Sequence, residues 1–200
     1  MYLSRDSALW IIALALLSTA CERRPRQQVQ AFYNLDSLIS MQVKRLAELQ
    51  PSLEKKAVIN GVSEKVVLQD LDSAGWAQEF EIFRQLDLNE KARNASQYRS
   101  ERGLRDATSN LGIIQYTAMQ PLPLSYVRVY YQDTPTKVRR IVGEVFDKNR
   151  LYASGRLLSM EFIDLNGRPA VVSYEIRGGQ RMILGDSMKF VVRGALTYDE

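Results

Sequence analysis

The chain of 200 residues is 46% hydrophobic and 25% charged, a composition typical of a globular protein that can bury a core without disulfides or metals. It has no histidine and one cysteine, which excludes an internal disulfide and catalytic triads with a histidine base, and disfavours zinc or copper sites. The net charge of +4 fits an ordinary solvated surface.

The first 20 residues predict a signal peptide. Ala8 to Leu17 form an apolar run of ten residues, which is about half the length of a membrane-spanning helix. Ser18, Thr19 and Ala20 then precede Cys21, and small residues before a cysteine resemble the lipobox that lipoprotein signal peptidase recognises. In that chemistry the thiol is joined to diacylglycerol, and the small side chains let the protease reach the peptide bond. We therefore predict cleavage before Cys21 and a lipid anchor on it.

Two alternatives stay open for this leader. Because Ser18 stands where Leu is commonest, an ordinary secretory signal with an incidental cysteine, or an uncleaved anchor helix, would also fit. Residues 21–31 are polar and predict a lipidated N-terminus and tether. Glu22, in place of an Asp after the cysteine, favours the outer membrane. The predicted location is therefore the cell envelope, lipid-anchored, with the periplasmic or surface-facing leaflet left open.

Residues 32–200 predict a single extracytoplasmic α+β domain that begins with an amphipathic helix. Apolar residues recur at steps of three and four between Phe32 and Leu49, which places one apolar stripe along a helix. Pro51 disfavours a helical Gln50, so the helix should end there. We interpret the stripe as core, with a membrane-surface face or a partner seam as alternatives.

A hairpin and a second amphipathic helix should follow. Asn60-Gly61 lies between β-prone runs at 57–59 and 62–68, which predicts a type I′ turn because both residues tolerate positive φ. Asp72 or Ser73 is the expected N-cap of the second helix. The apolar face of this helix carries Trp76, Phe80, Phe83 and Leu86.

The rest of the chain changes from polar to β-prone. Residues 89–110 mix basic and acidic side chains without apolar periodicity and predict a solvated helix or long loop rather than a contact surface for a polyanion. Gly178-Gly179 is predicted to be a turn. The β-prone runs are 111–119, 125–132, 137–147, 150–164, 168–177, 180–184 and 188–196. Short turns between them predict two helices packed on a bent antiparallel β-meander.

Residues from about 35 onward resemble a group of uncharacterised lipoproteins of Gram-negative bacteria. The residues that carry the resemblance are Ile59-Asn60-Gly61, then Trp76, Glu79 and Phe83, then Asp87-Leu88-Asn89-Glu90-Lys91. The resemblance implies the same location in the cell envelope and the same single-domain layout. It implies nothing about an activity.

Three functions are compatible with these patterns. We favour a non-enzymatic envelope lipoprotein that binds a partner protein or has a structural role, with no nucleic-acid partner, no cofactor, no metal and no catalytic residues. An alternative is a carrier or sensor of an apolar ligand in a half-barrel pocket. A third is a hydrolase with two carboxylates, for which Glu144, Glu161, Asp164 and Glu175 are equally available. The pocket of the carrier would be lined by Tyr116, Tyr126, Tyr130, Tyr131, Tyr152 and Tyr174.

Overall fold

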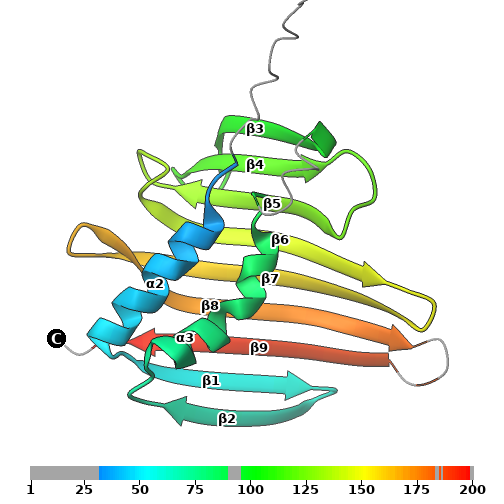
Figure 1. Ribbon diagram of the computed structural model, residues 1–200, viewed down its shortest axis with the longest axis horizontal. Coiled ribbons are helices and arrows are strands. Elements are labelled where there is room, and N and C mark those ends of the chain that lie inside the picture. Colours follow the sequence, from blue (N-terminus) through cyan, green and yellow to red (C-terminus); the bar gives the residue numbers. More distant parts are fainter. Residues whose placement is uncertain (1–31, 90–95, 183–184, 186, 199–200) are drawn as a thin grey trace, which may run out of the picture. The chain divides into compact units, whose positions relative to one another are not determined.

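The computed structural model describes residues 32–89, 96–182, 185 and 187–198, which belong to one compact unit, Ala31–Glu200. They form an α+β fold, as predicted: a nine-stranded antiparallel sheet with helices α2 and α3 lying across one of its faces (Figure 1). No helix in this described part of the chain is both long and apolar enough to span a membrane.

The order of the strands differs from the order of the sequence at one place. From one edge to the other the sheet reads β2-β1-β9-β8-β7-β6-β5-β4-β3, so the hairpin β1–β2 is added beside the last strand (Figure 1). The strands are β1 (Ser52–Ile59), β2 (Val62–Leu68), β3 (Tyr98–Arg105), β4 (Gly112–Ala118), β5 (Leu124–Tyr131), β6 (Val138–Lys148), β7 (Tyr152–Leu165), β8 (Arg168–Met182) and β9 (Ser187–Thr197).

Helix α2 (Leu35–Leu49) begins and ends where its sequence directs it. The Asn34 side chain accepts a hydrogen bond from the Ser37 amide at 2.8 Å and caps the N-terminus. Gln50 adopts a left-handed conformation, and its amide donates to the Leu46 carbonyl, which closes the last turn before Pro51. The residues of α2 that are buried are Leu35, Leu38, Ile39, Gln42, Val43 and Leu46.

The predicted hairpin and N-cap are both confirmed. Asn60 and Gly61 have φ values of 48° and 89°, as a type I′ turn requires, and they join β1 to β2. The Asp72 carboxylate accepts from the Gly75 amide at 2.8 Å and caps α3 (Ser73–Phe80). The chain continues as a 3₁₀ helix, η1 (Glu81–Leu86), which carries the last two of the predicted apolar residues.

The prediction of a helix or loop over residues 89–110 is wrong for residues 98–105, which form the edge strand β3, whereas residues 106–110 are a loop. Tyr98 anchors this strand: it is buried, and its hydroxyl donates to the Leu124 carbonyl at 2.9 Å. The remaining side chains are half-buried or exposed and mostly polar, and charged residues on an edge strand discourage pairing with another chain. A β-bulge at Gly103 further breaks the alternation that would have revealed the strand.

The predicted turn at Gly178-Gly179 is also wrong, because both residues lie inside the continuous strand β8. A Cβ atom at Gly178 would lie 2.6 Å from the Gly155 carbonyl oxygen and 2.8 Å from the Phe190 ring. Glycine is therefore required here by close packing between neighbouring strands rather than by a change of chain direction.

Candidate functional site

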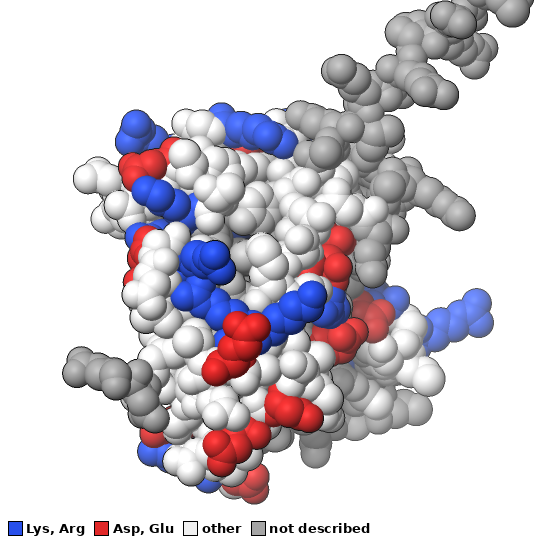
Figure 2. Space-filling model, turned by 60° about the vertical axis from the view of Figure 1, so that its left-hand side comes forward, with Lys and Arg blue, Asp and Glu red and all other residues white. Residues whose placement is uncertain are grey.

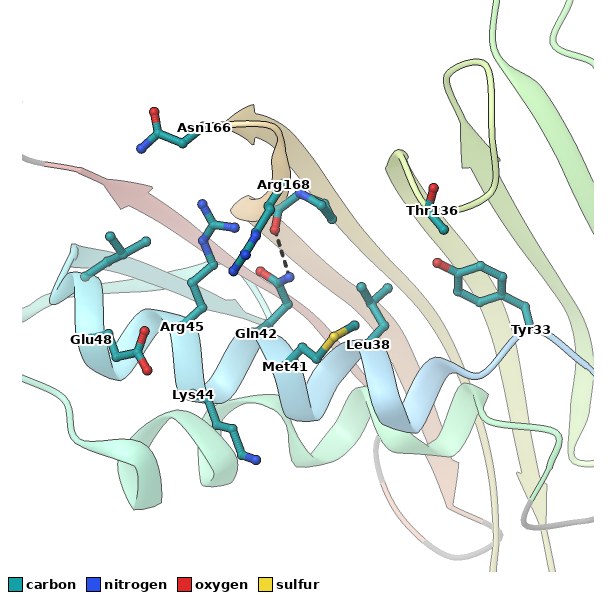
Figure 3. A pocket seen from close by; sticks show the side chains of 12 residues that line it. Tyr33, Leu38, Met41, Gln42, Lys44, Arg45, Glu48, Thr136, Asn166 and Arg168 are labelled. Carbon is teal, nitrogen blue, oxygen red and sulfur yellow. Dashed lines mark hydrogen bonds between the residues drawn. The ribbon is translucent and has the colours of Figure 1, made fainter.

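An open groove of about 710 Å³ runs along α2 (Figure 3). One wall is the helix. The other wall is formed by residues 166–169, around the turn between β7 and β8, and by Thr136 between β5 and β6. Tyr33, just before the helix, closes one end.

Gln42 fixes the distance between the two walls. Its side-chain amide donates to the Pro169 carbonyl at 2.9 Å, and its carbonyl oxygen accepts from the Val171 amide at 3.1 Å. Gln42 is 2% exposed, and both ends of its amide are satisfied by the backbone of β8. The helix therefore stands at a fixed position against the strand, and the groove beside it is preformed.

Two guanidinium groups enter the groove from opposite walls. Arg45 comes from the helix and donates to the Leu165 carbonyl at 2.6 Å, while Arg168 extends from the turn toward it (Figure 3). Arg168 and the nearby Lys44 make no ion pair with any residue that the structure describes. Figure 2 shows Lys and Arg side chains forming a band across the middle of this side, with Asp and Glu below and beside them.

Apolar side chains lie next to these cations. Leu38 and Pro169 form the closed side of the groove, and Met41 and Leu49 stand at its rim. Met41 is 56% exposed and Leu49 is 41% exposed, so both offer apolar surface beside the cations. The groove thus combines positive charge with apolar surface, and Glu48 is the one acidic side chain in its lining.

Tyr33 stays neutral at the end of the groove. Burial, and then the neighbouring Tyr116, raise the pKa of Tyr33 to about 12. Its hydroxyl donates to the Pro135 carbonyl at 3.2 Å. The charge of the groove at neutral pH therefore comes from the arginine and lysine side chains, balanced in part by Glu48.

A second hollow, of about 350 Å³, lies over β7, β8 and β9 and brings together two of the four acids considered from sequence, Glu161 and Glu175. Glu175 accepts from Arg193 at 2.6 Å and pairs with Arg177 at 2.8 Å, so both of its oxygens hold cations. Glu161 accepts from the Ser173 hydroxyl at 3.3 Å. Neither acid is brought together with Glu144 or Asp164 in this hollow.

The six tyrosines expected around a ligand cavity do not surround one hollow. Tyr116 and Tyr174 are buried in the core, where they meet phenylalanine rings edge to face. Tyr126 and Tyr130 lie under the guanidinium groups of Arg128 and Arg140, at 5.0 and 4.2 Å. Tyr131 packs beside Gly112. The Tyr152 hydroxyl donates to the Asp147 carboxylate.

The residues predicted to direct lipidation, Ser18, Thr19, Ala20 and Cys21, lie outside the described residues, as does the tether. Within the described part, no group of three or more acidic or cysteine side chains is placed to hold a metal ion. The groove is not evident from the sequence, because Lys44, Arg45 and Glu48 lie off the apolar stripe of the first helix and there look like ordinary solvated residues. Arg168 follows the β7–β8 turn, and nothing local in the sequence connects that turn to the helix.

Comparisons with protein-family models, with curated proteins and with solved structures found no match to this chain.

Proposed function

We propose that the protein is a lipid-anchored, non-enzymatic binding protein of the cell envelope, and that the groove along α2 binds an acidic segment of a partner protein. The observation that carries the proposal is the pair of guanidinium groups that enter one groove from opposite walls. Guanidinium groups favour carboxylates because both are planar and can form paired hydrogen bonds.

The apolar rim supports a peptide rather than a small inorganic anion. A partner segment with one or two carboxylates and an adjacent apolar side chain would cover Met41 and Leu49 while it pairs with Arg168. Burial of exposed apolar surface beside a charge pair is a common arrangement at protein interfaces. Gln42 fixes α2 on β8 before a partner binds, so less conformational entropy is lost when the complex forms.

A carrier of an apolar ligand remains the alternative. It would use the predicted bend of the sheet, concave toward two amphipathic helices, to enclose a chamber. The described core is filled at the place where that chamber would lie, since Leu158, Tyr116 and Tyr174 are at most 2% exposed. We therefore favour the open groove, and extraction of lipid from the purified protein tests the alternative.

Photo-crosslinking in living cells tests the groove. A crosslinking amino acid at Met41 should give a discrete protein adduct, and Arg168→Glu should abolish it, since the reversed charge repels an acidic segment. The matched control places the crosslinker at Val67 on β2, which is about as exposed, 53% against 56%. An adduct at Met41 that survives Arg168→Glu, or the same adduct from Val67, would contradict the proposal.

Intact mass tests the anchor independently. The protein purified from membranes should begin at Cys21 and carry two or three acyl chains, and Cys21→Ala should lose them. An unlipidated product or an uncut leader would contradict the anchor and leave the groove proposal standing.

A further inference from the structure

Three strand pairs, β1–β2, β6–β7 and β8–β9, end side by side at the end of the sheet away from the groove, on the right in Figure 1. The structure describes the turns of the first two pairs in full. The first is tied to the last strand, because the Asn60 amide donates to the Lys189 carbonyl at 2.9 Å and its side chain accepts from the Lys189 amide at 2.8 Å. The pairing of Lys148 with Ala153, and of Ala153 with Arg181, places the β6–β7 turn beside them. We call the described residues 59–62, 146–152, 181–182 and 187–189 the turn end.

The turn end exposes large apolar side chains. Leu151 and Val62 are each 70% exposed, at the tips of their turns. Isolated exposed apolar residues are ordinary, but a group at one end of a molecule indicates a contact surface. The others are Ile59, Phe146, Met182 and Met188.

Unpaired cations lie among these apolar side chains. Lys148, Arg150, Arg181 and Lys189 are all exposed and form no ion pair with a described residue. Asp147 is the one acid among the described residues of the turn end, and its carboxylate accepts from the Tyr152 hydroxyl at 2.6 Å. The opposite end differs, because there Lys137 pairs with Asp133 and Arg139 lies 3.8 Å from Asp164.

Apolar tips surrounded by lysine and arginine match the chemistry of a bilayer surface. Apolar side chains gain free energy by entering the boundary between headgroups and acyl chains, and cations gain it from anionic headgroups. Backbone groups at a turn can remain in the hydrated headgroup layer while the side chains insert. A protein partner would require a complementary acidic surface, whereas an anionic bilayer supplies negative charge over its whole area.

We infer that the turn end docks on an anionic lipid surface, with Leu151 and Val62 inserted and the four cations at the headgroups. This orientation holds the domain on the membrane by a contact separate from the lipid anchor. The groove lies at the opposite end of the sheet and stays free to receive a partner.

A fluorescent label tests the docking on the full chain in phospholipid vesicles that contain about one-third phosphatidylglycerol. An environment-sensitive dye on Leu151→Cys should shift to the blue and be quenched by lipids with a quencher in their acyl chains. The matched control is the same dye on Ala107→Cys, in the exposed turn between β3 and β4 at the opposite end. It should show neither effect. The lipidated thiol of Cys21 does not react with the dye, and Cys21→Ser is added if intact mass shows a free thiol.

Charge variants provide the second arm. Lys148→Gln with Arg150→Gln should reduce the ratio of docked to undocked Leu151 label about tenfold or more, because each cation near an anionic surface contributes about a fivefold effect on the docking equilibrium. Arg105→Gln with Lys137→Gln removes the same charge from the opposite end and should leave docking unchanged. A Leu151 label that remains in water overturns the inference. A label that is shielded but not quenched by the lipids also overturns it, because that result indicates a protein contact. Intact mass reports the anchor and the dye reports the docking, so either can fail alone.

Discussion

The two faces of the sheet place polar groups under different conditions. On the face covered by α3, Glu79 accepts from the Tyr174 hydroxyl and pairs with Lys55 at 2.7 Å, with its side chain only 13% exposed. On the opposite face, which no described helix covers and which we call the bare face, Glu175 makes a similar set of contacts with Arg177 and Arg193, which are more than half exposed. Water can replace a lost partner on the bare face but not under the helix. Similar-looking contacts therefore differ in their contribution to stability.

The largest difference between the faces should come from apolar truncation. Phe80 of α3 is fully buried between the rings of Trp76, Phe83 and Tyr174. Phe80→Ala should lower the free energy of unfolding by about 3–5 kcal/mol, through lost burial and a residual cavity. Leu157→Ala on the partly exposed bare face should cost about 1 kcal/mol. Urea unfolding of both variants measures the difference, and equal losses would show that the bare face is covered in solution.

Neutralising one acid on each face gives the next effect. Glu79→Gln leaves the partly buried Lys55 ammonium without a carboxylate and should lower the free energy of unfolding by about 2 kcal/mol. Glu175→Gln should cost about 0.5 kcal/mol or less, and the loss should shrink further in 0.5 M salt. Chemical denaturation at two salt concentrations tests both. A larger loss for Glu175→Gln would contradict the contrast.

A smaller effect should come from the stacked arginines of the bare face. Arg140 covers the ring of Tyr130, which is 6% exposed. Arg140→Gln should lower the free energy of unfolding by about 0.5–1 kcal/mol, the range of an exposed cation–π contact. Arg140→Lys keeps the charge and should therefore recover about half of that loss. The other half should stay lost, because lysine lacks the flat guanidinium that stacks on the ring. A Lys variant as unstable as Gln would indicate that the shape of the guanidinium, rather than its charge, is what stabilises the pair.

The last effect is absent at neutral pH and should appear only in alkali. Since burial raises the pKa of Tyr33 to about 12, while an unfolded tyrosine ionises near 10, the unfolded chain loses this proton first. The stability from this group is complete below pH 10 and is lost as the pH rises from 10 to 12. Across that pH interval, the midpoint temperature of thermal unfolding should fall less steeply for Tyr33→Phe than for the unchanged protein. An unchanged decline would place the Tyr33 hydroxyl in water.

Local signals in the sequence were sufficient where neighbouring residues determine the structure. The turn at Asn60-Gly61 and the cap at Asp72 depend on φ preferences and on contacts within three residues of the chain. The apolar stripe of α2 included most of its buried residues, but it missed the buried Gln42 and included Leu49, which is 41% exposed. The fold class followed from these elements and from the closely spaced β-prone runs.

The failures lie where distant segments determine the structure. Tyr98 is the one strongly buried side chain of β3, and its partner carbonyl belongs to Leu124, so no periodicity reveals the strand. Position 178 requires a glycine because Gly155 and Phe190 on the neighbouring strands leave no room for a side chain. The groove exists because Gln42 holds α2 against β8. These two hydrogen bonds of one side chain join segments that are far apart in the sequence. Only the folded chain therefore shows that Arg45 and Arg168 share a groove.

The position of the β1–β2 hairpin has a consequence for how the protein reaches this structure. Strands β3 to β9 can pair one after another as synthesis proceeds, because each lies beside the strand made before it. One edge of β1 pairs with β2, but its other edge has no partner until β9 is synthesised. Leu53 of β1 pairs with Leu196, almost at the other end of the described chain. Until then an early-made hairpin exposes an unpaired edge that favours misassembly. Because this pairing joins distant parts of the chain, we expect it to form late in folding.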